Sequence, residues 1–162
     1  MACLGGGSRN GGVAALEFGL LLPVLAVLFV GIVDFSMVYH DELQLASALA
    51  AGAQYAFAKG QTESGAALTA DVSGFVTSIS AIPLVSVGAS YNNGGDAGGC
   101  YCVTGAQAAY TGPVACGGAC ADGSTAGKYV TLSAGFDYTP MFAADQVFFT
   151  NPLMQSVTVR LQ

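Results

Sequence analysis

The feature that most constrains this chain is one apolar run near its N-terminus. From Val13 to about Ser36 the only charged residues are Glu17 and Asp34. As a helix the run spans roughly 36 Å at 1.5 Å per residue, enough to cross a bilayer with some tilt. Arg9 precedes the run and the next basic residue is Lys59. This asymmetry predicts a cytoplasmic N-terminus, a transmembrane helix over 13–36 and an outer domain over 37–162.

A cleaved secretory signal peptide is the main alternative for this run. The apolar region is long for a signal peptide, and no small-x-small cleavage site follows it. The helical pattern also continues beyond the run. Pro23 should only kink a membrane helix, because neighbouring groups compensate for the lost backbone hydrogen bond. A retained anchor is therefore the favoured interpretation.

Charge and composition exclude several classes of function. Hydrophobic residues make up 53% of the 162 residues and charged residues only 9%, with a formal net charge of -6. Four scattered basic residues cannot follow a phosphate backbone, so we expect no nucleic-acid partner. The single histidine, His40, follows the membrane run and is expected on a solvated helix face. No credible nucleophile–base set remains, so we predict that the protein is not an enzyme and needs no cofactor.

The outer part of the chain predicts an α+β domain. A first helix should extend from about Val13 to Ala58, and a second should follow the Thr62–Ser64 cap and end near Ile82, before Pro83. Alternating apolar residues predict strands at 85–91, 130–138 and 156–161. These strands would form a small antiparallel sheet covered by the first helix. The face expected to make that contact is Phe35, Tyr39, Leu43, Ala46, Leu49, Ala53 and Ala56.

A 36-residue loop, Asn92–Gly127, contains the remaining chemical signal, two cysteine pairs. Pairing within Cys100-x-Cys102 is strained, so two disulfides between this pair and the pair Cys116 and Cys120 are favoured. If the loop is an extended hairpin, its register favours Cys102 with Cys116 and Cys100 with Cys120, although other connectivity stays open. Neither spacing fits a zinc ribbon, so no metal is expected; a metal or redox module is the minor alternative.

Glu17 is the residue whose position most needs a reason. It lies about one turn inside the apolar helix, between Leu16 and Phe18. Water and the helix dipole could stabilise an interfacial acid there. An acid inside a membrane segment is nevertheless a functional-site hypothesis, with a cation as its expected partner.

The residues around Glu17 resemble a prepilin processing site. In Gly12-Val13-Ala14-Ala15-Leu16-Glu17-Phe18, cleavage after Gly12 would make Val13 the first residue and Glu17 the fifth. The longer stretch, Ala15–Pro23 and Gly31–Phe35, is similar to the TadE-like minor pilins of tight-adherence systems. The likeness continues in the helix end at Ala50–Ala56 and in the cysteine loop followed by Lys128–Leu132 and Tyr138–Phe142. The leader departs from the family's pattern, because Arg9 is its only basic residue and Asn10-Gly11 precede Gly12.

This resemblance implies a minor pilin, or pseudopilin, with a leader at 1–12 that a prepilin peptidase removes between Gly12 and Val13. Glu17 and Phe18 would serve assembly and register in a tight-adherence (Flp, type IV-like) pilus used in cell adhesion. The implied partners are the peptidase, the assembly platform with its ATPase, the major pilin and other minor pilins. The implied location is the bacterial inner membrane, with the C-terminal domain periplasmic and possible incorporation into an extracellular pilus. The rival hypothesis is an uncleaved single-pass membrane protein whose disulfide-bonded outer domain binds a partner or a cell-wall component.

Overall fold

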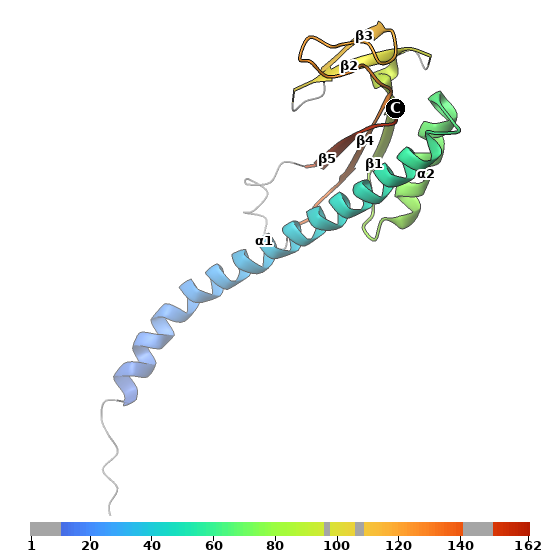
Figure 1. Ribbon diagram of the computed structural model, residues 1–162. Helices are drawn as coiled ribbons and strands as arrows, with labels where there is room; N and C mark the ends of the chain where they lie inside the picture. The colour runs from blue at the N-terminus through green and yellow to red at the C-terminus, as the bar shows by residue number, and fades with distance from the viewer. Residues whose placement is uncertain (1–10, 96–97, 106–108, 141–150) are drawn as a thin grey trace, which may run out of the picture. The chain divides into compact units, whose positions relative to one another are not determined.

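The computed structural model describes residues 11–95, 98–105, 109–140 and 151–162 of the chain (Figure 1). It has the α+β composition that the sequence predicts. The chain forms two compact units, one ending at Val38 and one comprising Tyr39–Gln162, and each is described by itself. The elements in chain order are α1 (Gly11–Lys59), α2 (Gly65–Ile79), β1 (Ser86–Tyr91), the short 3-10 helix η1 (Asn92–Gly94), β2 (Cys100–Thr104), β3 (Ala109–Val114), β4 (Tyr129–Phe136) and β5 (Leu153–Arg160).

Helix α1 confirms the prediction of one long N-terminal helix. It contains 49 residues and continues through Pro23 without a break. The prediction of Val13–Ala58 differs from its ends by two residues at the start and one at the end. In the first unit most of the large apolar side chains described are exposed, as in Leu16, Leu20 and Phe29, while Val38 is buried. Asp34, near the end of the apolar run, is only 1% exposed.

The predicted contact face of α1 is confirmed at Leu49 and Ala56 but wrong at Tyr39 and Leu43. Tyr39 and Leu43 are 56% and 53% exposed, while Leu45 is fully buried and Leu49 is 3% exposed. The buried face is rotated around the helix because it uses small residues where α1 meets α2 and the sheet. A Cβ on Gly52 would collide with Val76 Cγ2 and lie 3.3 Å from Leu132 Cδ1. The buried face in the second unit is Leu45, Ala48, Leu49, Gly52 and Ala56.

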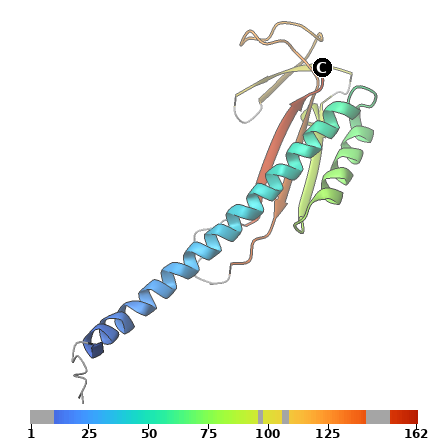
Figure 2. The same ribbon diagram turned by 60° about the horizontal axis from the view of Figure 1, so that its bottom comes forward.

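Helix α2 lies beside the last turns of α1 in both views (Figures 1 and 2). Leu68, Val72 and Val76 are its buried residues, spaced four apart as an amphipathic helix requires. The ring of Phe75 stacks on that of Tyr55 in α1, with centroids 4.5 Å apart. The helix ends at Ile79, three residues earlier than predicted, because Ser80 already has extended backbone angles.

Strand β4 is the centre of a three-stranded antiparallel sheet ordered β1-β4-β5. Ala89 of β1 pairs with Leu132 of β4, and Leu132 also pairs with Val157 of β5. The predicted strands are confirmed, although β5 begins at Leu153, before the residue predicted. On β4 the alternating residues Val130, Leu132, Ala134 and Phe136 are buried and form the core together with the helices.

The cysteine loop forms a second sheet, the hairpin of β2 and β3. It joins the rest of the domain through two backbone bonds between Tyr101 and Gly127, of 2.7 and 3.0 Å. The hydroxyl of Tyr110 also lies 2.7 Å from that of Thr131 on β4. The segment predicted as a long loop therefore contains a hydrogen-bonded hairpin, as the extended-hairpin interpretation requires.

Candidate functional site

The first candidate site is the start of α1, which contains the predicted processing and assembly residues. The helix begins at Gly11, so the Gly12–Val13 peptide lies in its first turn. Val13 is 61% exposed and Phe18 60% exposed. Glu17, one turn after Val13, is also exposed and forms no ion pair with another residue that the structure describes. The processing and assembly roles of these residues remain predictions.

The exposure of apolar side chains continues beyond Phe18. Large residues such as Leu21, Leu25 and Ile32 are at least half exposed. Leaving this much apolar surface in water is unfavourable, at about 25 cal/mol for each Å². By length and composition α1 could cross a membrane, and within the described residues it is the one helix that could. The structure is thus compatible with a membrane anchor at this position.

Both disulfides predicted between the cysteine pairs are present, but the connectivity suggested by a simple hairpin register is wrong. Cys100 bonds to Cys116, and Cys102 bonds to Cys120. Their Cα atoms are 5.0 and 5.7 Å apart, within the usual range for disulfides. With all four thiols in disulfides, these cysteines supply no metal-binding thiolate in this structure.

The reason for the different pairing lies in where the chain turns. The cysteines do not face each other across one hairpin, because Cys100 pairs with Val114 and Cys102 with Thr111 in β3. The chain then continues past Val114, so Cys116 stays near Cys100. It next folds back, and Gly118 and Cys120 pair with the segment 124–126 through backbone bonds of 2.8 Å. This second turn brings Cys120 to Cys102.

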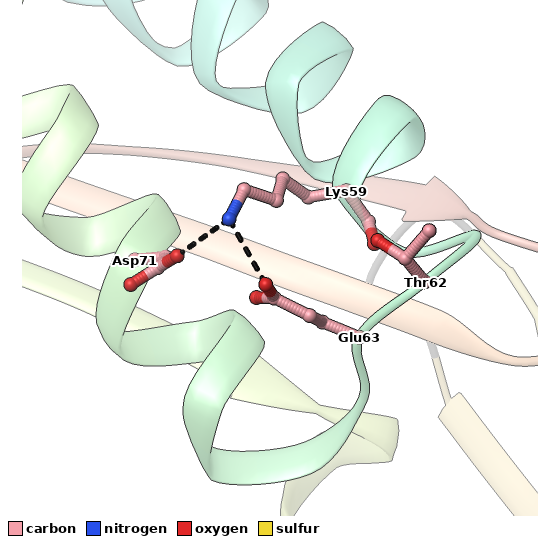
Figure 3. A network of polar contacts seen from close by, with 4 residues as sticks. All are labelled: Lys59, Thr62, Glu63 and Asp71. Atoms are coloured by element: carbon pink, nitrogen blue, oxygen red, sulfur yellow. Dashed lines mark hydrogen bonds and ion pairs between the residues drawn. The ribbon is translucent and has the colours of Figure 1, made fainter.

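An ion-pair network that the sequence only partly indicated fixes the end of α1 (Figure 3). The Nζ atom of Lys59 lies 3.0 Å from both Glu63 Oε1 and Asp71 Oδ2. Hydrogen bonds to Asp71 and then to Glu63 raise the pKa of Lys59. The hydroxyl of Thr62 donates to the Lys59 carbonyl at 3.1 Å. Lys59 lies in the last turn of α1, and its contact with Asp71 depends on how α2 packs.

Asn92 is a buried polar residue that the sequence did not reveal. It is 1% exposed and has φ of 47°, a left-handed conformation that Asn tolerates better than most residues. Its side chain accepts a 2.9 Å bond from the Tyr129 amide and donates a 3.1 Å bond to the Gly99 carbonyl. It therefore ties the start of the cysteine segment to β4. An isolated Asn-Asn-Gly signals a turn, but not which distant strand it contacts.

Among the comparisons with known proteins, the family model described as TadE-like protein matches residues 12–54. No curated protein and no solved structure matched the chain. The matched segment forms most of helix α1, from the Gly12–Val13 peptide to the turn before Tyr55. It includes Glu17, Phe18 and the buried face of α1 up to Gly52. Over residues 12–54, therefore, this chain is similar to the TadE-like proteins.

Proposed function

We propose that this protein is a minor pilin of a tight-adherence pilus, made as a precursor and processed between Gly12 and Val13 by a prepilin peptidase. The supporting observation is the coincidence of three features at one end of α1. The TadE-like match begins at Gly12, the exposed apolar stretch begins at Val13, and Glu17 lies one turn further. Residues 1–12 would be the leader, and the helix over 13–36 would hold the domain on the periplasmic side of the inner membrane.

Processing would create the cationic partner that Glu17 needs inside a membrane. Cleavage after Gly12 frees the α-amine of Val13, a cation at neutral pH. An isolated carboxylate in hydrocarbon is strongly unfavourable, so pairing Glu17 with the amine of a neighbouring subunit would favour one axial register. In this mechanism the peptidase switches the protein from a membrane-anchored precursor to a subunit that can assemble.

The outer half of α1 has a surface suited to a neighbouring helix. On the side away from the buried face, Tyr39, Leu43 and Phe57 are each more than half exposed. Exposed Ala46 and Ala50 follow Leu43 at three- and four-residue steps, and Phe57 lies about two turns after Ala50, so the five residues form one stripe. Small residues between bulky ones allow close helix packing. This stripe would contact other pilins, while the assembly platform with its ATPase would drive their addition.

The processing step is tested by the mass of the mature N-terminus, measured on protein purified from membranes of a cell that carries the pilus system. We expect a chain that begins at Val13. A chain with Met1 intact would reject the proposal and support the uncleaved single-pass protein instead.

The assembly step is tested by Glu17→Gln, with Glu42→Gln as the matched control on the same helix outside the apolar run. Loss of the carboxylate should leave membrane insertion and the Val13 N-terminus unchanged but lower surface piliation by at least about tenfold, since an interaction of several kcal/mol is removed. The control should retain normal piliation. Wild-type piliation in Glu17→Gln would show that the carboxylate does not set the register.

A further inference from the structure

An open pocket of about 300 Å³ lies between α1 and the end of α2, the helix that runs back alongside α1 (Figure 2). The residues that line it come from α1, from the last turn of α2 and from the segment after that turn: Gln44, Ser47, Ala48, Ala51, Ile79 and Ala81. All of them belong to the second compact unit. A volume of this size suits a small group rather than a large ligand. None of the sequence motifs and none of the proposed assembly contacts uses this pocket.

Gln44 gives the wall of the pocket a hydrogen-bond acceptor that has no donor. Its Oε1 atom is shielded from solvent and unpaired, and it is the one side-chain atom of this kind among the residues that the structure describes. The other end of the amide is occupied, because Nε2 lies 3.1 Å from His40 Nδ1, which accepts when the ring is neutral. Buried polar atoms are nearly always paired in folded proteins, so this acceptor indicates a pocket suited to a hydrogen-bond donor.

The electrostatic surroundings favour a donor that carries a positive charge. The last carbonyls of a helix have no partner inside it and form the negative end of its dipole. In α2 this end has no basic residue in the last turn, and Ile79 of that turn lines the pocket. Asp41 lies three residues before Gln44, on the same side of α1, and its side chain is only partly buried. The whole chain also has a formal net charge of -6.

The lining indicates which cation fits. Apart from Gln44 and Ser47 it is aliphatic, and none of the described residues that line it has the aromatic ring that recognises a quaternary ammonium. It also has no carboxylate to accept the two parallel bonds of a guanidinium. A primary ammonium has three N–H donors that point in different directions, and its methylene stem can lie along apolar side chains. The lining therefore favours a primary ammonium on an aliphatic chain.

A lysine side chain has this chemistry, with four methylenes to cover the aliphatic wall. The pocket is open, so a side chain can enter it while the rest of its protein stays outside. The ammonium of an ethanolamine lipid fits less well, because it lies two carbons from a phosphate. The acceptors of the pocket and the Asp41 carboxylate would repel that anion.

We propose that this pocket binds the side-chain ammonium of a lysine from a partner protein, with Gln44 Oε1 accepting one of its hydrogen bonds. The alanines and Ile79 cover the methylenes of that lysine. The site depends neither on processing at Gly12 nor on the carboxylate of Glu17. It would give the outer domain a polar point of contact in addition to the apolar stripe of α1.

The test uses the full chain in micelles of an uncharged detergent, with ¹⁵N in the side-chain amides of glutamine. Titration with Nα-acetyl-lysine amide should shift the Gln44 side-chain amide and saturate. The side-chain amide of Gln54, exposed on the same helix outside the pocket, should not move. The Gln44 signal is identified by its loss in Gln44→Met, and sodium chloride at equal ionic strength corrects for the effect of salt.

Four other probes separate the chemistry and the source of the ligand. Nα-acetyl-norleucine amide, which lacks the ammonium, and Nα-acetyl-arginine amide should each bind at least about tenfold more weakly than the lysine probe, the range for a hydrogen bond to a charged group. Phosphatidylethanolamine added to the micelles should produce no saturable shift. n-Butylammonium, which represents a free amine, should bind no more tightly than the lysine probe.

Gln44→Met removes the acceptor at similar size and should weaken binding of the lysine probe by about tenfold or more. Gln44→Glu, which places a charged acceptor there, should strengthen binding, and Gln54→Met should leave it unchanged. Equal binding of the norleucine or arginine probe, tighter binding of n-butylammonium, a saturable shift with the lipid, no saturable shift at Gln44, unchanged affinity in Gln44→Met or weaker binding in Gln44→Glu would each overturn the proposal. If Gln44→Met failed to fold, the comparison of probes on the wild-type chain would still decide it.

Discussion

Gly52 and Gly74 are both helical glycines, but substituting them with alanine should change stability in opposite directions. Alanine is favoured over glycine in a helix interior by about 1 kcal/mol. Gly74 in α2 is exposed, and a Cβ there would meet nothing within 4 Å. We therefore expect Gly74→Ala to raise the free energy of unfolding by about 0.5–1 kcal/mol.

At Gly52 the same gain is outweighed by a steric clash. A Cβ there would overlap Val76 Cγ2, and it would lie 3.3 Å from Leu132 Cδ1. Val76 and Leu132 are each 1% exposed, so neither can move into solvent. Overpacking of a dense core costs about 1–3 kcal/mol, and this clash belongs at the upper end of that range. After the helical gain is subtracted, Gly52→Ala should lower the free energy of unfolding by about 1–2 kcal/mol.

The assay is thermal unfolding of the full chain in detergent, followed by circular dichroism. A difference of 1 kcal/mol corresponds to a shift in Tm of about 4 °C for a domain of this size. The double variant Gly52→Ala with Val76→Ala should lose less stability than the two single variants summed, because the second change removes the atom that clashes. If Gly52→Ala were as stable as the wild type, the close packing of α1 against α2 would be wrong.

Two further predictions concern the segment that carries the cysteines. Asn92→Ala should lower the free energy of unfolding by about 2–4 kcal/mol, because it leaves the part-buried Gly99 carbonyl and Tyr129 amide without their side-chain partner. Asn93→Ala, at an exposed residue with a similar φ of 52°, should lower it by about 1 kcal/mol or less. Urea unfolding of the two variants side by side measures the difference, and equal losses would mean that the buried bonds contribute nothing. Replacing Cys102 and Cys120 together by Ala should lower the free energy of unfolding by about 3 kcal/mol, because their disulfide closes a loop with a sequence separation of 18. This double variant should expose no new free thiol, because the disulfide between Cys100 and Cys116 remains intact. The crossed variant that replaces Cys102 and Cys116 should instead give two additional free thiols on titration after denaturation, and finding none would contradict the connectivity.

The helices and the main sheet could be predicted because their signals are local. On β4, Val130, Leu132 and Ala134 alternate with polar or half-buried residues, and a strand with one buried face imposes that period. In α1 no proline falls between Phe35 and Phe57, and the predicted end of the helix at Ala58 is one residue from its observed end at Lys59. These features depend on the residues nearest in sequence, so they can be predicted from a single sequence.

Cysteine connectivity and the pocket depend on packing between distant segments. The spacing of Cys100 and Cys102 favours bonds to the second pair, but the choice of partner depends on a turn after Val114 that no local period marks. The same holds for the pocket of about 300 Å³ between α1 and the end of α2, which forms only because these two segments pack together. Sequence patterns identify elements reliably but give little about the sites that form between them.

The error over the contact face of α1 has a physical origin that bears on function. A helix with apolar residues on more than one side gives no unique choice of buried face. The bulky stripe with Tyr39 and Leu43 has the larger apolar area, so hydrophobicity alone assigns it to the core. Close packing instead selects the side with Leu45 and Gly52, where the helix backbone can approach α2 and β4. The domain therefore leaves the bulkier stripe exposed, and this is the surface that a neighbouring pilin helix would need.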